Sequence, residues 1–225
     1  MRALHLAIFS ALLLTVSCLK KEGPAVNVTG AGGTVTGDEI VIGEVGSMTG
    51  GAATFGKSTH DGIMLAVEKI NAAGGIKGKK VRIISLDDQG KPEEAAIATT
   101  KLITQDKVIA ILGEVASSNS LAMAPIAQKN GIPMVTPSST NPKVTEIGDY
   151  VFRVCFIDPF QGSVMAKFAY NSLKLKNVTI LRDVKNNFSI GLADFFIETF
   201  TKLGGKIVVD QSFSQGDEIG RASCR

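Results

Sequence analysis

Two hydroxyl-rich segments are the strongest candidates for chemistry in this sequence. Residues 113–120 read GEVASSNS and residues 136–142 read TPSSTNP, and each segment directly follows a short apolar run. Hydroxyls and backbone groups with little formal charge suit a zwitterion such as an amino acid. Ser117 and free N–H groups at a helix start would bind its carboxylate, to which the helix dipole adds about 0.3–1 kcal/mol. The backbone carbonyl of Ser138 and the hydroxyl of Thr140 would accept hydrogen bonds from its ammonium group.

The same residue types also have an ordinary structural use. Ser, Thr and Asn are favoured at helix N-caps and in turns, so for any single one of them capping explains the sequence as well as ligand contact does. The functional interpretation depends on their clustering. Ligands of open α/β sheets bind beyond the carboxyl ends of the strands, and both segments follow predicted strands.

A second candidate is the nucleotide-binding pattern G-x-x-x-x-G-K-[ST], which residues 51–58 (GAATFGKS) satisfy. In a true phosphate-binding loop the first Gly stands at the end of the strand, and Lys57 and Ser58 would reach phosphate and Mg²⁺. Here the predicted strand ends near Val45, and five residues intervene before Gly51. We therefore reject a nucleotide-hydrolysing enzyme, which is the least favoured of the functions considered.

The sequence shows no catalytic or metal-binding set. His60 has no candidate nucleophile nearby and is interpreted as a solvated surface residue, and Asp87 and Asp88 are interpreted as turn and helix-cap residues. Cys155 lies in an apolar run and is expected to be a small buried hydrophobic residue. With only 3 Cys and 2 His, neither a structural metal site nor a disulfide framework is expected, and no cofactor is called for.

The elements that must position these residues alternate along the chain. Apolar runs of strand length are separated by helical patterns, which predicts βαβ units on a parallel sheet. The predicted strands are 40–45, 81–86, 108–112, 132–135, 151–155, 178–181 and 207–209. The predicted helices are 57–72, 92–106, 118–130, 159–175 and 189–203. Pro125 implies a kink or a late start in the third helix.

The N-terminal segment indicates export. Residues 1–17 combine one Arg with an apolar run too short to span a membrane comfortably, which is typical of a signal peptide. Residues 14–18 (LTVSC) resemble a bacterial lipobox, in which Cys18 carries lipid; Thr15 is a poor match, so cleavage without lipid is the alternative. Residues 18–38 are Gly- and Thr-rich and are interpreted as a flexible tether. Residues 218–225 (EIGRASCR) resemble translated sequencing adapter and are interpreted as a non-native tail.

Order, spacing and loop chemistry together resemble one protein family. The stretches IGEVGSMTGGAATFGKS, beginning at Ile42, and GEVASSNSLAMAPIAQKNGIPMVTPSSTNP, beginning at Gly113, are similar to the periplasmic substrate-binding proteins of branched-chain amino acid ABC transporters. The resemblance covers residues 39–216. It implies an α/β fold of two lobes that close on a ligand, with a first lobe at 39–156 and the start of a second, incomplete lobe at 157–217.

The resemblance also implies a ligand site. Ser117 and Thr140 match contacts to the ligand's carboxylate and amino groups, and Ser138 matches a backbone contact. Phe55 falls where the family carries an aromatic residue near the ligand. Phe188 falls where Tyr is frequent, so one hydroxyl contact is expected to be missing.

The expected function is that of a non-enzymatic binding protein. It would bind a branched-chain or related small amino acid, or an amide, and deliver it to an ABC permease. Its expected place is the periplasm or the outer face of a bacterial membrane, where it would act as a lipid-anchored monomer. A ligand-sensing module of the same fold is the alternative. With a net charge of +3 and adjacent basic pairs only at Lys20-Lys21 and Lys79-Lys80, nucleic acid is not an expected partner.

Overall fold

The computed structural model describes residue 37 and residues 39–217. The predicted signal peptide, Cys18, nearly all of the tether and the tail 218–225 lie outside these described residues. Among the described helices, none is long and apolar enough to cross a membrane.

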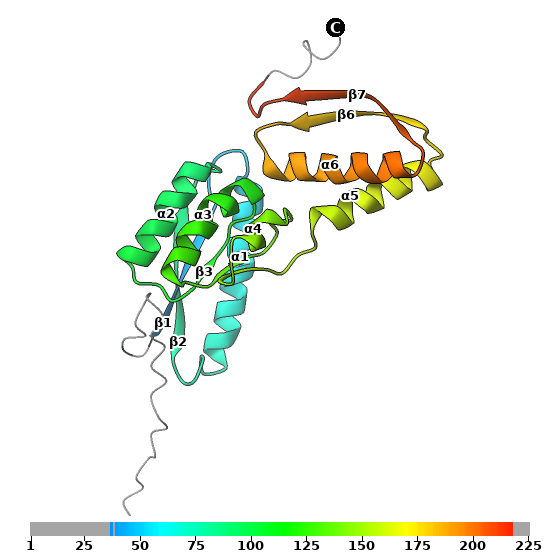
Figure 1. Ribbon diagram of the computed structural model, residues 1–225. Coiled ribbons are helices and arrows are strands. Elements are labelled where there is room, and N and C mark those ends of the chain that lie inside the picture. Colours follow the sequence, from blue (N-terminus) through cyan, green and yellow to red (C-terminus); the bar gives the residue numbers. More distant parts are fainter. Residues whose placement is uncertain (1–36, 38, 218–225) are drawn as a thin grey trace, which may run out of the picture.

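The first sheet has five parallel strands in the order β2-β1-β3-β4-β5 (Figure 1). Its strands are β1 (Glu39–Gly46), β2 (Lys80–Asp87), β3 (Ile111–Leu112), β4 (Met134–Thr136) and β5 (Val151–Arg153). Helices connect successive strands: α1 (Ala53–Ala72), α2 (Pro92–Thr104), α3 (Ser117–Asn130) and the short α4 (Lys143–Glu146). Parallel strands joined by helices place the loops that follow β1, β2, β3 and β4 along one edge of the sheet.

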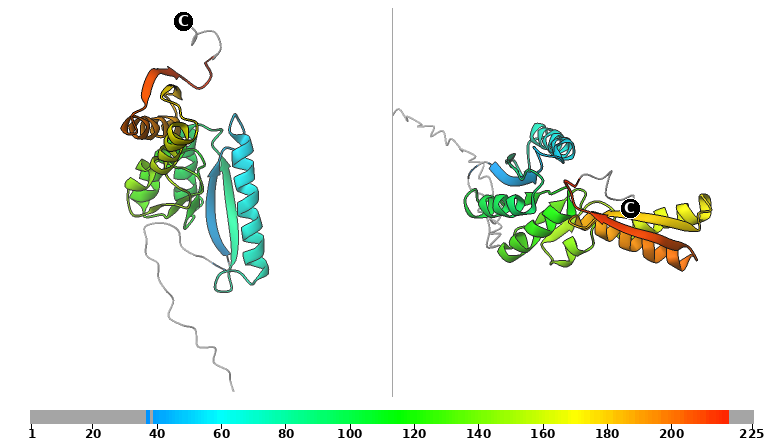
Figure 2. Two further views of the ribbon diagram at one scale, coloured as in Figure 1. Left: turned by 90° about the vertical axis from the view of Figure 1, so that its right-hand side faces the viewer. Right: turned by 90° about the horizontal axis from the view of Figure 1, so that it is seen from above.

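The first sheet is covered by helices on both faces, with α1 on one side and α2 and α3 on the other (Figure 2). The core lies between the sheet and α2 and α3, and its members are fully or almost fully buried apolar side chains. They include Val45, Leu102, Ile111, Met123, Ala127 and Met134. Such burial contributes about 25 cal/mol per Å² of apolar surface, so this unit carries most of the hydrophobic stabilisation of the described chain.

A second unit follows β5 and contains two parallel strands, β6 (Asn177–Asp183) and β7 (Lys206–Phe213). It begins with α5 (Asp158–Lys167) and a π-helical turn η1 (Phe168–Ser172), and α6 (Asn187–Lys202) connects its strands. Phe200 is its fully buried centre, packed against Tyr170, Phe196, Val178 and Ile207.

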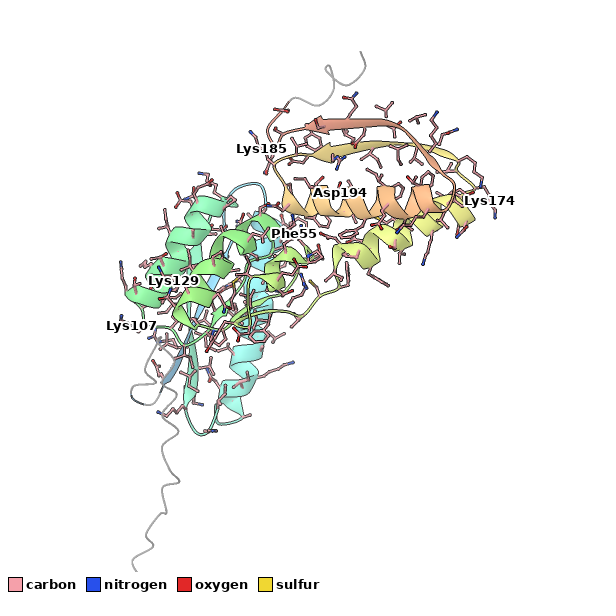
Figure 3. The ribbon with its side chains drawn as sticks, in the orientation of Figure 1. Phe55, Lys107, Lys129, Lys174, Lys185 and Asp194 are labelled. Carbon is pink, nitrogen blue, oxygen red and sulfur yellow. The ribbon has the colours of Figure 1, made fainter. Side chains whose placement is uncertain are left out.

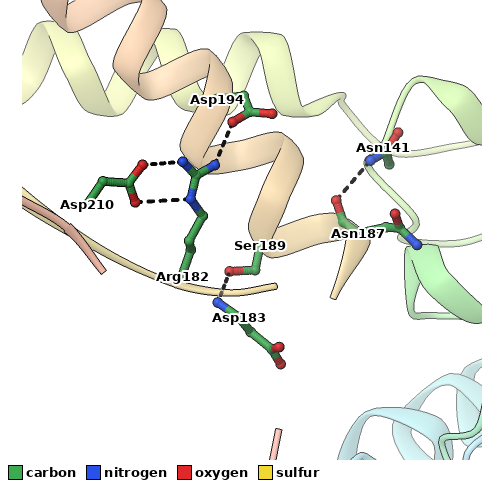
Figure 4. Close-up of polar contacts among 7 residues, drawn as sticks. All are labelled: Asn141, Arg182, Asp183, Asn187, Ser189, Asp194 and Asp210. Carbon is green, nitrogen blue, oxygen red and sulfur yellow. Dashed lines mark hydrogen bonds and ion pairs between the residues drawn. The ribbon is translucent and has the colours of Figure 1, made fainter. Parts of the chain in front are cut away.

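Only one face of the second sheet is covered. Figures 1 and 2 show α5 and α6 together on one side of β6 and β7. Arg182 on β6 joins the layers, because its guanidinium pairs with Asp194 on α6 at 2.6 Å and with Asp210 on β7 (Figure 4). Leu181 and Val208, by contrast, are each about half exposed.

The predicted α/β fold with parallel sheets is confirmed, and the differences are local. Residues 108–110 run beside β1, and Ile109 N donates to Val41 O at 3.1 Å, but only Ile111–Leu112 forms regular strand. β5 ends at Arg153, so Cys155 lies in the segment between the two sheets and is half-buried; its predicted burial in a strand is wrong. The third helix does not start late, because α3 begins at Ser117 and contains Pro125.

Candidate ligand-binding site

Ser117 lies at the first turn of α3, at the carboxyl edge of the first sheet. The N-cap residue Ala116 has no side-chain cap, so the first-turn N–H groups have no capping oxygen. Ser117 Oγ accepts a hydrogen bond from Asn141 N at 3.2 Å. A serine hydroxyl has one hydrogen to give, and this contact leaves it available. Ser117 therefore presents a hydroxyl donor beside backbone N–H groups, which is the chemistry that binds a carboxylate.

The segment after β4 lies against this helix start. Ser138 is exposed and its hydroxyl donates to Val115 O at 3.1 Å, which ties the two segments together. Thr140 is 7% exposed, and apart from its interaction with the Asp158 carboxylate its Oγ1 has no hydrogen-bond partner among the described residues. A hydroxyl oxygen can also accept hydrogen bonds, so the Thr140 oxygen is available to a donor on a ligand.

Asp158 is a site residue that the sequence did not reveal. It is fully buried at the first turn of α5, and its N donates to Thr140 O at 2.9 Å. Apart from the Thr140 hydroxyl, its carboxylate oxygens have no hydrogen-bond partner within the part of the chain that the structure describes. Burial raises the pKa of Asp158, and the hydrogen bond from Thr140, followed by the positive charge of Arg153, opposes that rise. An acidic residue before Pro159 is ordinary first-turn composition, so the sequence carried no signal for this role.

The second unit covers these loops with the start of α6. Asn141 Nδ2 donates to Asn187 O at 2.9 Å (Figure 4), and Asn187 N donates to Ser118 Oγ at 3.0 Å. Gly191 allows this approach, because a Cβ atom there would lie 2.6 Å from Asp158 Oδ2. The structure thus brings Ser117, Thr140 and Asp158 together beneath α6.

The two aromatic residues predicted near the ligand are less closely held. Phe55 is 66% exposed near the start of α1, at the end of that helix nearer to the second unit (Figure 3). Phe188 is 36% exposed in the first turn of α6, where its N donates to Asn186 Oδ1. Neither ring is packed into the loop cluster, so their ligand contacts remain predictions.

The nucleotide-binding pattern does not form a phosphate loop. Residues 53–58 are the first turns of α1, and Ser58 Oγ donates to Thr54 O at 2.9 Å inside the helix. Gly56 has a packing role instead: a Cβ atom there would lie 2.0 Å from Ser47 O. The glycine lets α1 lie directly on the segment after β1.

Three other sequence interpretations change with the structure. His60 is not simply solvated, because its Nδ1 lies 2.7 Å from Oε2 of the buried Glu44. Asp87 ends β2 and Asp88 follows it; their carboxylates accept from Gln89 N and Gly90 N in the turn that comes next, but neither residue caps α2, whose N-cap is Lys91. Both carboxylates instead accept hydrogen bonds from the segment after β1, which connects that segment to the end of β2. Although burial acts to raise it, hydrogen bonds from Thr49, Gln89 and Met48 lower the pKa of Asp87.

The described residues contain no group of three or more His, Cys, Asp or Glu arranged to hold a metal ion. The polar groups that converge are hydroxyls, backbone N–H and C=O groups and the Asp158 carboxylate. Such a set can bind an anionic and a cationic group side by side.

Comparison with known proteins identifies the family to which the chain belongs. The family described as periplasmic binding protein matches residues 39–218. An amino acid binding protein from Pseudomonas aeruginosa is 39% identical over 181 residues, covering 80% of this chain and 48% of the relative. The chain thus spans about half the length of the curated relatives it matches.

Two solved structures are similar in fold and sequence. The leucine-binding protein LivK from Thermotoga maritima has a TM-score of 0.75 and 46% identity, covering 79% of this chain and 50% of that one. The substrate-binding protein LivJ from Streptococcus pneumoniae, in complex with isoleucine, has a TM-score of 0.75 and 36% identity, covering 80% and 51%. The described fold agrees with these matches, and the chain belongs to the periplasmic binding protein family.

Proposed function

We propose that the protein is the extracytoplasmic solute-binding component of an ABC transporter and that it binds a branched-chain or related small amino acid. The observation that carries the proposal is the buried pair formed by Thr140 Oγ1 and the Asp158 carboxylate, which has no hydrogen-bond partner outside the pair in the described chain and lies next to the hydroxyl of Ser117. A ligand with both a carboxylate and an ammonium group satisfies all of them. The relatives that bind leucine and isoleucine support this ligand class.

The two charged groups of the ligand would be held by different segments. Its carboxylate accepts from Ser117 Oγ and from the first-turn N–H groups of α3. Its ammonium donates to Ser138 O, Thr140 Oγ1 and Asp158, which supplies the negative charge. The start of α6 then closes over the ligand, with Phe55 and Phe188 beside its side chain.

The rest of the proposal concerns the whole protein. It captures its ligand in the periplasm, or at the outer face of the membrane if Cys18 carries lipid. It acts as a monomer that presents the ligand to the permease and performs no catalysis. Its lobes would be 39–156 and a second one beginning at residue 157.

Isothermal calorimetry of the full chain with amino acids, amides, urea and small carboxylates tests the proposal. We expect leucine, isoleucine or valine to bind, and Ser117→Ala to weaken binding by about tenfold or more, because a hydrogen bond to a charged group contributes about 1.5–3 kcal/mol. Ser172→Ala, which removes an exposed hydroxyl beyond α5, is the matched control and should bind as the unaltered protein does. The proposal is wrong if no zwitterion binds.

A further inference from the structure

Glu114 lies three residues before Ser117, and its side chain is completely buried. Its Oε1 accepts from Ser47 N at 3.1 Å, and its Oε2 accepts from Ala116 N at 2.5 Å. Ala116 is the N-cap of α3, so the Glu114 carboxyl group joins the start of the ligand-binding helix to the segment after β1.

The backbone carbonyl of Glu114 is equally well connected. It accepts a hydrogen bond from Thr136 Oγ1 at 2.6 Å, and Ser139 Oγ and Ser120 Oγ each lie 3.0 Å from it. Because these two serine hydroxyls are also 2.7 Å apart, one donates to the other and only the second has its hydrogen free for the carbonyl. Two of these hydroxyls come from β4 and the segment after it, which carries Thr140. One residue therefore joins the segments after β1, β3 and β4.

The hydroxyl of Ser47 shows that a carboxyl group here carries a proton. Ser47 Oγ lies 2.9 Å from Asp88 Oδ1 and 2.9 Å from Glu114 Oε1, but a serine hydroxyl can donate only one hydrogen. Both contacts are hydrogen bonds only if one of the carboxyl groups donates to Ser47 in turn.

The proton belongs on Glu114. Asp88 accepts from Gly90 N at 2.9 Å and from Asn119 Nδ2 at 2.8 Å, and Glu114 likewise accepts from two backbone N–H groups, so the burial and charge around Glu114 decide between the two carboxyl groups. Burial, followed by the negative charge of Asp88, raises the pKa of Glu114 to about 7. The resulting chain runs from the Glu114 O–H to Ser47 Oγ and from the Ser47 O–H to Asp88.

We propose that Glu114 is a positioning residue whose protonated carboxyl group holds the ligand-binding start of α3 in place, so that ligand affinity falls when Glu114 loses its proton. The proposal rests on the proposed function, because it is the ligand's carboxylate at Ser117 that adds a further negative charge to this region. It assigns to Glu114 a role in binding without direct contact with the ligand.

The charges around Glu114 determine whether ionisation of Glu114 strengthens or weakens ligand binding. Asp88 approaches from the segment after β2, while α3 and β4 contribute hydroxyls and Asn119. Arg153 on β5 directs its Nη1 to the carbonyls of Ser139 and Asn141, at 3.0 and 2.8 Å. Ionised Glu114 would face ionised Asp88 across a single hydroxyl, and the bound carboxylate would repel it further.

The pH dependence follows from proton linkage. The pKa of Glu114 is higher in the folded protein than the ordinary value of 4.5, so the folded state holds more protons between these two values. The stability that Glu114 contributes is therefore present at low pH and is lost as the pH rises from about 4.5 to about 7. Ligand affinity should fall as the pH rises through about 7 and above, because the bound carboxylate favours protonated Glu114.

The test is the variant Glu114→Gln in the full chain. The Gln amide can donate to Ser47 Oγ and accept from Ala116 N, as the protonated carboxyl group does, and it does not titrate; its nitrogen gives up only the hydrogen bond from Ser47 N, a loss that is the same at every pH. Both proteins are measured from about pH 5.5 to about pH 8. As the pH rises, calorimetry with leucine should show a severalfold loss of affinity for the unaltered protein, and thermal melts without leucine should show a falling melting temperature. Glu114→Gln should show neither change. Taking the difference between the two proteins removes the pH dependence that they have in common.

Two further variants separate positioning from simple support of the fold. Glu114→Ala leaves the N–H groups of Ser47 and Ala116 unpaired and should bind about tenfold more weakly than Glu114→Gln. Glu68→Gln alters an exposed glutamate on α1 and should follow the unaltered protein at every pH.

The proposal is overturned if the unaltered protein shows no pH dependence or if Glu114→Gln shows the same one. Should Glu114→Gln fail to fold, Asp88→Asn replaces it: removal of the neighbouring charge should move the transition of the melting temperature to lower pH, and an unmoved transition contradicts the proposal. If leucine and the other amino acids do not bind at all, the proposed function fails, while the melts still decide whether Glu114 carries the proton.

Discussion

At the scale of single residues, the site is defined by polar groups whose hydrogen-bonding capacity is unused. Ser117 accepts a hydrogen bond and retains its own hydrogen to donate, whereas Thr140 Oγ1 and the Asp158 carboxylate have no partner beyond each other in the described part of the chain. Unsatisfied buried groups destabilise a protein by about 1–3 kcal/mol each. Their concentration in one place indicates that this free energy is recovered when a ligand binds.

Thr140→Val tests this interpretation directly. Valine has nearly the same shape as threonine but no hydroxyl, and the hydroxyl interacts only with Asp158, so the stability of the ligand-free protein should change by no more than about 1 kcal/mol. Affinity for leucine should nevertheless fall by about tenfold, because the ammonium group loses an acceptor. Urea unfolding and calorimetry measure the two effects. Thr100→Val, on the exposed side of α2, is the control; a loss of stability in Thr140→Val without a loss of affinity would contradict the assignment.

At the scale of elements, the close packing of α1 on the segment after β1 positions Ser47, and through it Glu114. Gly56 makes this packing possible, because any Cβ atom there would overlap Ser47 O at 2.0 Å. The helix also explains why a sequence that satisfies a nucleotide-binding pattern forms no phosphate loop. The second glycine of the pattern, Gly56, is required by the close approach of the Ser47 backbone to α1.

Gly56→Ala should therefore destabilise the protein although alanine favours helices. Overpacking of this kind costs about 1–3 kcal/mol, and displacement of Ser47 should weaken ligand binding as well. Gly62→Ala lies on the same helix with nothing within 4 Å of the new Cβ atom, and it should stabilise the protein by about 0.5–1 kcal/mol. Urea unfolding of both variants measures the difference, and equal effects at the two glycines would contradict the packing argument.

At the scale of the whole molecule, the two sheets differ in how much of their apolar surface is covered. The first sheet lies between helices on both faces, whereas β6 and β7 have helices on one face only (Figures 1 and 2). A sheet of two strands is marginal without further packing. Phe156, just before α5, and Phe160 and Val164, within it, are also about half exposed or more exposed than that.

Residues 39–217 should therefore not unfold as one cooperative unit. Hydrogen exchange measured by mass spectrometry should show fast exchange of the amides in β6 and β7 and slow exchange in β1, β3 and β4, because local stability follows buried apolar contact. Thermal melts should be broad. A single sharp melt, with equal protection in both sheets, would contradict this expectation.

The sequence by itself determined the α/β class and the approximate positions of most elements. Alternation of short apolar runs with helical patterns depends on local periodicity, which a single sequence displays. It also directed attention to the segments that contain Ser117 and Thr140, because ligands bind beyond the carboxyl ends of parallel strands. Element ends such as the short β3 and β5 were less predictable, since they depend on which neighbouring strand is available for pairing.

Only the tertiary structure decided which polar residues act together. Glu114 contacts Ser47 across 67 positions of sequence, and Asn187 contacts Ser118 across 69. No local sequence pattern distinguishes Asp158. Its importance comes from its burial beside Thr140, with no other hydrogen-bond partner for its carboxylate in the described chain. Burial and hydrogen bonding between distant segments are properties of the packed chain, and local periodicity carries no information about them.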